Sequence, residues 1–461
     1  MTSTHGRALG LRYVVLLNVV AIFSLRTVTD VARLGWAALP LTVAAFVVFF
    51  VPLTLAVVSL SSRYPDNGGL YRWTHTAFGP AHGFVCGWSY FVTNLAFFPA
   101  VLTHVAVVLP WMLFGHRAAF VQDPRYVVAV GLIGLWGLGV LPNALGARRT
   151  AQLSGLGAAG LFVGTAILAV MAGSAALQGV SSSPSTSAWL PSLHSGNAIA
   201  TYAMLSSLPF MFAGLELAPT MGGEVRDASR TLVLAALVAG ALVTVLFLIA
   251  IVAVVLGLRP GDIELTDGIP AAIAALSTRL GAPDLVARAV AACLVVAAIG
   301  AVVVWMAGTA HVVRAAGVDR AMPAWFTREH PRFGTPVGGL VAQGVAASVL
   351  LLASVAGSSV REAYAILRSV TQLLYFIPFL YLFASHWRLQ RGRRMAVRIT
   401  SATGFLTTLA GLVAAALPPS DVSSVAVFEL KVLGGSAALI LAGLPLYLRA
   451  RRAALPLATT T

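Results

Sequence analysis

Charged residues stand inside stretches of the chain that are otherwise apolar, and they are the first candidates for chemistry. Glu216 lies in the run 199–222, where Pro209, Gly214 and Pro219 would break a helix. A charge at the centre of a bilayer costs about 2.5–3.5 kcal/mol on insertion scales, so a charge there is retained only for a reason. Glu216 could carry a proton or contact a substrate beside the break, or it could be a buried carboxylate that joins neighbouring helices.

The run 12–36 holds a second such group, formed by Arg26, Asp30 and Arg33. The guanidinium of Arg26 can bind a substrate carboxylate through two parallel hydrogen bonds. It can equally balance Glu216 across the bundle, which spares both residues an unpaired buried charge. Asp30 lies four residues after Arg26 on the same helical face and is a third potential partner. Arg33 stands near the outer end of the run, where its long side chain can reach the headgroups.

Three further residues are candidates for contact or gating. Arg368 lies about two turns inside the run 362–388. It could close an outer gate by pairing with Asp30, or it could form a packing ion pair that never opens. Phe210 and Trp305 stand near the middle of their runs. Their flat apolar faces could stack on a substrate or simply pack against neighbouring helices.

Motifs for catalysis, nucleotide binding or metal binding do not appear in the sequence. There is no metal-spaced set of His, Cys and Asp residues, no nucleophile elbow and no P-loop. The two cysteines, Cys86 and Cys293, both lie in apolar runs, so neither a disulfide framework nor a metal site is indicated. We therefore expect a protein that is not an enzyme and that needs no cofactor and no metal.

Membrane-spanning helices must position these residues. Of the 461 residues, 59% are hydrophobic and only 10% are charged, against about 25% charged in an ordinary soluble domain. Continuous apolar runs favour helices, because an isolated strand leaves its backbone unsatisfied in lipid. A soluble enzyme and a nucleic-acid-binding protein are excluded. We predict an all-α polytopic membrane protein with twelve transmembrane helices, at about 12–36, 38–61, 81–113, 125–145, 152–177, 199–222, 231–257, 285–315, 336–356, 362–388, 396–417 and 427–449.

The basic residues predict the orientation of these helices. The formal charge of +15 sits in short loops rather than in a nucleic-acid-binding patch. With the N-terminus in the cytoplasm, most of the 30 Lys and Arg residues fall on the inner side, and the densest cluster runs from Arg388 to Arg398. Both termini are then cytoplasmic, as an even number of helices requires, and the protein lies in the cytoplasmic membrane.

The interrupted runs 12–36 and 199–222 occupy corresponding places in two halves of the chain. Such a pair points to an inverted-repeat transporter whose binding site lies near the bilayer midplane. The predicted organisation is a cytoplasmic N-terminus (1–11), a first five-helix repeat (12–177), an extracellular loop (178–198), a second five-helix repeat (199–388), two C-terminal helices (389–449) and a cytoplasmic tail (450–461).

Three stretches resemble signatures of the amino acid–polyamine–organocation (APC) superfamily. They are YPDNGGLYRWTHTAFGPAHGFVCGWSYFV at 64–92, FAGLE followed by GEVRDASR within 212–230, and VVRAAGVDRAMPAWFTREHPRFGTP at 312–336. They occur in the order that the family shows, and the likeness extends along essentially the whole chain. The segment LPPSDVSS, between the last two predicted helices, is similar to the glutamate/γ-aminobutyrate antiporter branch.

The resemblance implies a LeuT-type fold of five plus five helices with two extra helices, which transports an amino acid or a related amine by alternating access. Each end of a broken helix carries a partial charge of about half a unit, so a substrate carboxylate seeks residues 24–27 and its ammonium seeks carbonyls near 23 and 212–213. By family position, Phe210 and Trp305 line the site and Glu216 lies on its cytoplasmic side. The candidate substrate-binding residues are Phe23, Ser24, Leu25, Arg26, Thr27, Phe210, Phe212, Ala213, Gly214 and Trp305, and the candidates for proton transfer or gating are Glu216, Asp30 and Arg368.

The sequence departs from the family pattern at the first break, where Phe23 to Arg26 replace a glycine-rich stretch. A side-chain cation there would assist or replace backbone donors. Thr309 alone stands where a sodium site needs paired Ser or Thr residues, so sodium coupling is not expected. The expected function is secondary transport of an amino acid, as exchanger or proton symporter, by a monomer or homodimer. A polyamine or organocation permease and a permease-like sensor without turnover stay open, as does the involvement of protons.

Overall fold

The structure, a computed structural model, describes residues 9–65, 68–180, 189, 198–259, 262–318, 323–356, 358–390, 395–419, 422 and 424–454. The regular elements in these ranges are all helices, apart from an isolated bridge between Leu9 and Val225. The predicted all-α class is therefore confirmed. Most of the predicted extracellular loop 178–198 lies outside the described residues, as do the ends of the predicted N-terminal and C-terminal segments.

The first part of the chain forms α1 (Leu11–Ile22), α2 (Leu25–Ala32), α3 (Ala38–Ala45), α4 (Val51–Arg63), α5 (Leu70–Phe78), α6 (Pro80–Phe114), α7 (Pro124–Ile133), α8 (Leu141–Ala144) and α9 (Ala147–Leu177). The second part forms α10 (Ala198–Leu205), α11 (Ser207–Met211), α12 (Leu217–Thr220), α13 (Ala228–Gly257), α14 (Gly268–Leu280), α15 (Leu285–Val318), α16 (Ala324–Thr327), α17 (Val337–Val355) and α18 (Val360–Leu389). The chain continues with α19 (Met395–Ala415), α20 (Val425–Glu429), α21 (Gly435–Leu441) and α22 (Leu444–Ala454).

Eleven of the described helical stretches are long and apolar enough to cross a membrane. They correspond to the predicted segments, with one exception. The predicted sixth segment, 199–222, is divided into α10, α11 and α12, and its apolar helical stretch, which joins α10 and α11, covers only Ile199–Met211. The polytopic character is thus confirmed. The total of twelve helices stays a prediction, because the interrupted sixth segment is not among the eleven.

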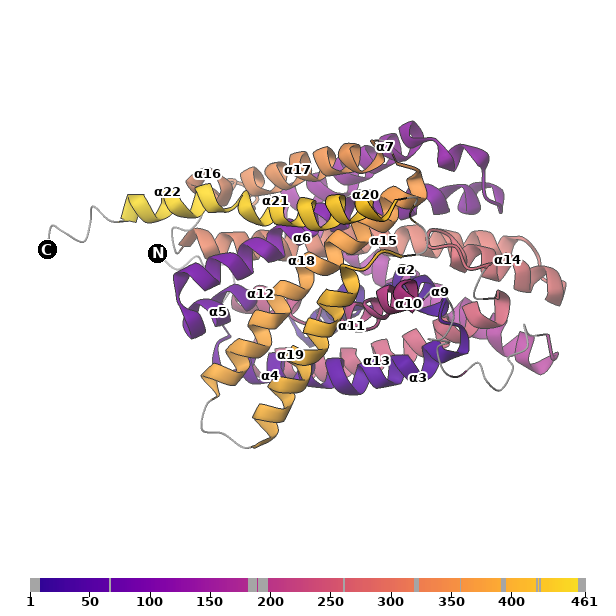
Figure 1. The fold of residues 1–461 in the computed structure, drawn as a ribbon, viewed down its shortest axis with the longest axis horizontal. Coiled ribbons are helices and arrows are strands. Elements are labelled where there is room, and N and C mark those ends of the chain that lie inside the picture. The colour runs from indigo at the N-terminus through magenta and orange to yellow at the C-terminus, as the bar shows by residue number, and fades with distance from the viewer. Residues whose placement is uncertain are drawn as a thin grey trace, which may run out of the picture.

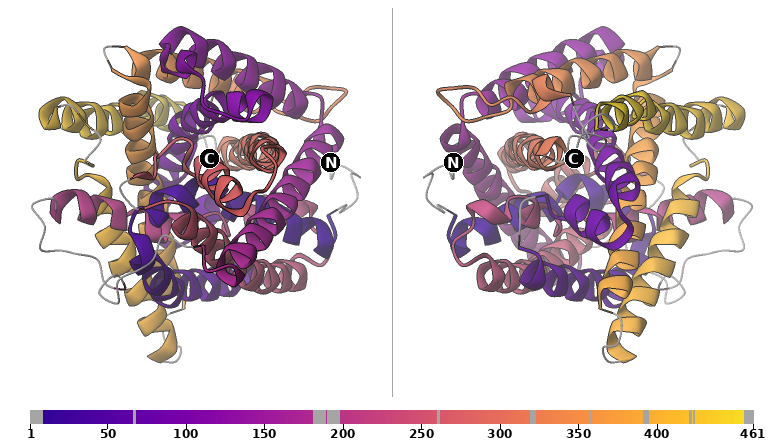
Figure 2. Two further views of the ribbon diagram at one scale, coloured as in Figure 1. Left: turned by 90° about the vertical axis from the view of Figure 1, so that its right-hand side faces the viewer. Right: turned by 90° about the vertical axis from the view of Figure 1, so that its left-hand side faces the viewer.

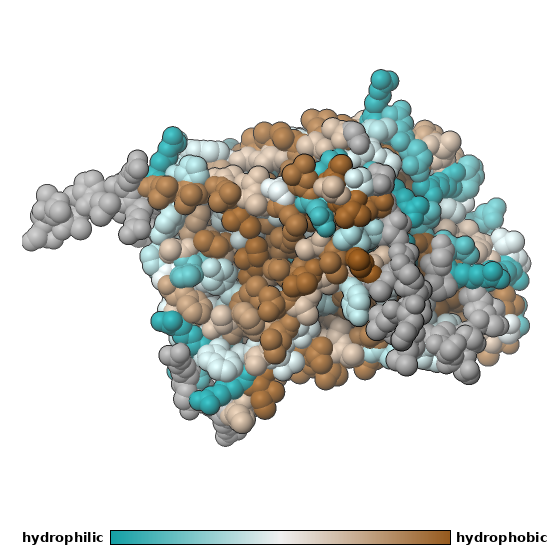
Figure 3. All heavy atoms as spheres, viewed as in Figure 1, coloured by the Kyte–Doolittle hydropathy of each residue, from teal (hydrophilic) through white to brown (hydrophobic). Residues whose placement is uncertain are grey.

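The outer surface of the bundle matches a membrane environment. Hydrophobic side chains cover the middle of the face in Figure 3, while polar side chains gather toward the two ends of the long axis. Most long helices run along this axis, whereas α18 and α19 cross the bundle obliquely (Figure 1). In Figure 1, α5 and α22 lie toward the left-hand end of the long axis, and α14 lies toward the right-hand end.

Both predicted helix breaks are present. Between α1 and α2, Phe23 and Ser24 adopt extended backbone, with φ/ψ of −75°/113° and −128°/115°. Between α11 and α12, residues 212–216 form a series of turns, in which Gly214 has a φ of +127°. A positive φ of this kind is accessible to glycine at little cost, so Gly214 allows the second break.

Helix α15 runs through the middle of the bundle, as the end-on views of Figure 2 show by its salmon ribbon. It crosses α9 at a contact between Gly157 and Gly300. A Cβ built on Gly157 would lie 2.7 Å from the Cα of Gly300, and a Cβ on Gly300 would lie 2.6 Å from the Cα of Gly157. The two backbones therefore touch directly, as small residues permit in membrane bundles.

Candidate functional site

A cavity lies between the two helix breaks. The space that it offers to water-sized molecules is about 60 Å³. About 10–15 Å³ of such space holds one water, so there is room for a few waters or the head group of a small molecule. Eight of the predicted substrate-binding residues line it: Phe23, Ser24, Leu25, Arg26, Thr27, Phe210, Ala213 and Trp305. The structure thus brings together residues that lie almost 300 positions apart in the chain.

Helices α6 and α18 contribute cavity residues that were not predicted from the sequence. Asn94, Phe97 and His104 come from α6, and Thr371 and Tyr375 come from α18. Phe97 carries no sequence signal, and the signal for the other four is a polar residue inside an apolar run, which does not say which neighbouring helix it faces. Within the described part of the chain, no group of three or more His, Cys, Asp or Glu residues is placed to hold a metal ion.

Arg26 follows the first break and is 5% exposed. Its Nη1 donates a hydrogen bond to the hydroxyl of Tyr364 at 3.1 Å. The guanidinium carbon lies 5.9 Å from the ring centroid of Phe97 and 6.0 Å from that of Tyr364, within the range of cation–π attraction. Its Nε has no hydrogen-bond partner. Aromatic faces thus hold this cation at the cavity wall and leave part of its donor capacity unused.

Asp30 and Arg368 lie next to this cavity but do not line it. Arg368 Nη1 is 3.1 Å from Asp30 Oδ1, and both side chains are buried. The predicted pairing of these residues is therefore present, whereas its role in gating stays a prediction. Their contact lacks the alignment of a hydrogen bond, since neither carboxylate oxygen of Asp30 accepts one.

Glu216, at the second break, is completely buried. Its Oε2 accepts the backbone N–H of Gly214 at 3.0 Å. Its Oε1 accepts the hydroxyl of Tyr90 at 3.3 Å and also that of Tyr375. Among the described residues no basic side chain forms an ion pair with it. The interpretation in which Arg26 neutralises Glu216 through an ion pair therefore finds no support in this arrangement.

Two other residues of the second break point away from the cavity. The Phe212 ring packs against Phe50 and Phe247, with centroid distances of 5.1 Å and 5.6 Å. Gly214 faces the first break instead, since a Cβ added to it would lie 2.8 Å from the carbonyl oxygen of Ala21. Successive turns at 212–216 direct neighbouring residues to different sides, and only Ala213 of these three reaches the cavity wall.

Trp305 connects α15 to the first break. Its indole Nε1 donates to the backbone carbonyl of Ala21 at 3.2 Å. Its ring lies 5.6 Å from the centroids of both Phe97 and Tyr375, and the ring of Phe210 lies 5.9 Å from that of Tyr375. These rings form an apolar wall at distances typical of edge-to-face aromatic contacts.

One face of α18 contacts both breaks. Because residues three and four apart share a helix face, its polar side chains form a continuous stripe. In the middle of the stripe, Gln372 accepts a hydrogen bond from Ser206 at 2.9 Å and donates one to Ser207 at 3.2 Å. The stripe comprises Tyr364 beside Arg26, Arg368 beside Asp30, Gln372 beside α11, and Tyr375 beside Glu216.

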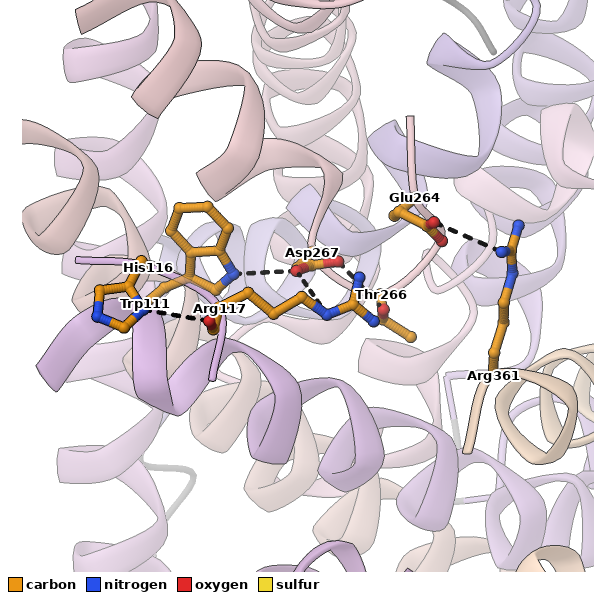
Figure 4. A network of polar contacts seen from close by, with 7 residues as sticks. All are labelled: Trp111, His116, Arg117, Glu264, Thr266, Asp267 and Arg361. Carbon is orange, nitrogen blue, oxygen red and sulfur yellow. Dashed lines mark hydrogen bonds and ion pairs between the residues drawn. The ribbon is translucent and has the colours of Figure 1, made fainter. Parts of the chain in front are cut away.

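A further polar network ties the segment before α14 to the bundle (Figure 4). Asp267 is buried and accepts the indole N–H of Trp111 at 3.0 Å, with Arg117 Nε at 3.7 Å. Glu264 forms an ion pair with Arg361 at 3.4 Å, at the start of α18. A Cβ on Gly268 would lie 2.6 Å from the Cγ2 of Thr29, so this segment also packs on α2.

Comparisons with known proteins agree with this architecture. The family model described as amino acid permease matches residues 10–429. An uncharacterized transporter of Legionella pneumophila is 24% identical, over 91% of this chain and 92% of that protein. An uncharacterized transporter of Mycobacterium tuberculosis is 28% identical, over 69% of this chain and 67% of its own length. A protein of Lactococcus lactis named "Probable agmatine/putrescine antiporter" is 21% identical, over 72% of this chain and 69% of its own. The chain therefore belongs to the amino acid permease family of the APC superfamily.

Proposed function

We propose that this permease is a secondary transporter that moves an amino acid or a related amine across the cytoplasmic membrane by alternating access. The observation that carries the proposal is the cavity between two broken helices, which Arg26 and several aromatic rings line together. Breaks at the midplane free backbone N–H and C=O groups, which can bind the charged ends of a small substrate.

The substrate carboxylate binds near residues 24–27, where the N-terminus of α2 and Arg26 both favour negative charge. The ammonium binds carbonyl groups near Phe23 and at 212–213. The substrate side chain then lies against Phe210 and Trp305, which limit its size and shape. Phe212 and Gly214 take part only through their backbone, in keeping with the direction of their side chains.

Access from the two sides is controlled by different residues. The Asp30–Arg368 ion pair closes the outer side, and Glu216 either carries a proton or links the second break to α6 and α18 on the inner side. The framework consists of the repeats 12–177 and 199–388, with residues 389–449 outside them and both termini in the cytoplasm. The transporter works as a monomer or homodimer.

Exchange and proton symport are alternative modes of this transport. The name of the Lactococcus lactis relative, an antiporter of agmatine and putrescine, supports exchange and keeps amines among the substrates to be tested. A permease-like sensor without turnover is the other alternative, because the same cavity would bind a ligand without carrying it.

Reconstitution into liposomes tests the proposal. Vesicles are preloaded with one amino acid or amine at a time, and counterflow of the labelled compound is measured with and without a pH gradient. Saturable counterflow is expected, and Arg26→Ala should abolish it while leaving folded protein in the membrane. Flux that does not saturate would indicate a channel, and binding without flux would indicate a sensor.

A further inference from the structure

We propose that Arg26 and His104 together form a carboxylate subsite, so that this permease takes amino acids and rejects the amines that lack a carboxylate. The inference deepens the proposed function, since it assigns a substrate class to the same cavity. It rests on polar atoms of the cavity wall that the protein itself leaves unpaired.

His104 is the first of these residues. It lines the cavity from α6, is 3% exposed, and neither ring nitrogen makes a hydrogen bond. The backbone of Thr266 lies near the ring but without hydrogen-bond geometry. A buried polar group without a partner is destabilising, because it has lost its hydrogen bonds to water. A ligand that accepts an N–H from this imidazole would remove that destabilisation.

Arg26 is the second cavity residue with an unpaired polar atom. A guanidinium offers five N–H donors in a planar fork, and here one hydrogen bond goes to Tyr364 while Nε has no partner. Arg26 and His104 both line this cavity. A carboxylate is the common group that fits a fork of this kind and accepts a further N–H from an imidazole.

The rest of the wall fits the other end of an amino acid. Asn94 also lines the cavity, and its Oδ1 accepts no hydrogen bond. Its Nδ2 is engaged with the carbonyl of Tyr90 at 2.9 Å, so the free atom is an acceptor suited to an ammonium. The wall therefore offers unused donors and an unused acceptor, the complement of a zwitterion.

A diamine would fit the same wall poorly. None of the residues lining the cavity is Asp or Glu. The two carboxylates nearby are already engaged, Asp30 with Arg368 and Glu216 with the hydroxyls of two tyrosines. A second ammonium would lie against Arg26 without a compensating charge, and such repulsion is a means of rejecting a wrong ligand.

Matched ligand pairs test the substrate class. Thermal stabilisation of the purified protein and counterflow in liposomes are measured for alanine against ethylamine, leucine against isopentylamine, and arginine against agmatine. At least one amino acid should bind about tenfold to a hundredfold more tightly than its amine, the range of a charged hydrogen bond. An amine that binds as tightly as its parent amino acid would overturn the inference.

Variants test the two residues. Arg26→Gln and His104→Gln should each weaken the amino acid about tenfold or more without weakening the amine, so that the preference shrinks. Arg26→Lys keeps the charge and should retain part of the preference, which guards against loss of folding. His386→Gln is the matched control, because His386 is a buried histidine bonded to Ser401 at 2.8 Å and outside the cavity wall. If His104→Gln behaves like this control, the histidine has no part in the subsite.

The transport proposal and the carboxylate-subsite proposal would be contradicted by different results. Stabilisation by amino acids but not amines, without any flux, would defeat transport and keep the carboxylate subsite. Saturable counterflow of amines with no preference for amino acids would keep transport and defeat the subsite.

Discussion

The two helix breaks that enclose the cavity are built in different ways. The first consists of Phe23 and Ser24 in extended backbone that any residue adopts, and it places Arg26 at the cavity. The second covers residues 212–216, depends on a φ of +127° at Gly214, and holds Glu216 behind two tyrosine hydroxyls. The first break is thus defined by its side chains and the second by its backbone.

This difference separates the two charges of the site. The positive group, Arg26, belongs to the cavity wall, whereas the negative group, Glu216, stands behind it. A substrate would therefore meet the first break through a side chain and the second mainly through carbonyl groups. Substitutions at the two breaks should have different consequences, which are most severe at the backbone of the second break and mildest at the hydroxyl groups of α18.

Gly214→Ala should be the most damaging substitution, because it attacks the backbone on which the second break depends. A Cβ at this position would lie 2.8 Å from the Ala21 carbonyl oxygen, and the positive φ alone costs a non-glycine residue about 1–3 kcal/mol. We expect low yield of folded protein and no uptake. Gly173→Ala is the control, since no atom lies within 4 Å of its added Cβ. Normal uptake by Gly214→Ala would show that the second break tolerates side chains as the first does.

Breaking the Asp30–Arg368 ion pair, which lies close to the first break, should strongly lower the stability of the folded protein. Removing one partner of a buried pair leaves an uncompensated charge, which costs about 3–5 kcal/mol. Arg368→Gln should therefore lower the unfolding temperature, and the double variant Asp30→Asn/Arg368→Gln should recover part of the loss. A double-mutant cycle measured by thermal unfolding gives the coupling. Additive single effects would mean that the 3.1 Å contact contributes no coupling.

Glu216→Gln should reduce transport rather than folding. The substitution keeps the size of the side chain but removes the charge that accepts three hydrogen bonds, each worth about 1.5–3 kcal/mol to an ionised acceptor. Initial uptake rates should fall about tenfold or more, with Glu429→Gln, an exposed carboxylate, as the control. If Glu216 carries the coupled proton, the residual uptake should also no longer respond to a pH gradient. Unchanged rates and pH response would leave Glu216 with a packing role only.

The mildest changes are expected from two matched tyrosines of α18. Tyr364→Phe removes the hydroxyl that accepts from Arg26, and Tyr375→Phe removes one that donates to Glu216. Each loss should change transport about threefold to tenfold, which is the net contribution of an ordinary single hydrogen bond. Tyr364→Phe should act mainly on the apparent KM, and Tyr375→Phe mainly on the maximal rate. Identical changes in both parameters would remove the functional distinction between the breaks.

The sequence alone predicted the helical class and the position of both breaks, because proline, glycine and charge gathered inside an apolar run indicate that the helix is interrupted there. It also offered Asp30 as a partner for Arg368 as well as for Arg26, and the structure places Asp30 against Arg368. It did not identify His104 or Asn94, since a lone polar residue in a long helix gives no sign of which neighbour it faces. Phe212 illustrates a second limit: the position of a residue in a break does not fix the direction of its side chain.

The other contacts made by α18 and those made by the segment before α14 were also not predicted from the sequence, because they depend on which helices pack together. The partners of the polar stripe from Tyr364 to Tyr375 can be identified only once α2 and α11 are seen to pack against it. The Asp267 network joins the segment before α14 to Trp111 and Arg117, which lie some 150 residues earlier in the chain. The boundaries of the two repeats stay a prediction from the pattern of breaks.

The contact of Gly157 with Gly300 has a consequence for how the cavity can change shape. The backbones of α9 and α15 are in direct contact at this crossing, so the two helices cannot move closer together there. Leu161 of α9 and Trp305 of α15 lie close to that crossing in sequence and both face the cavity. The side of the cavity formed by α9 and α15 is therefore rigid. Changes in cavity shape must come from the other side, which the two helix breaks and α18 form.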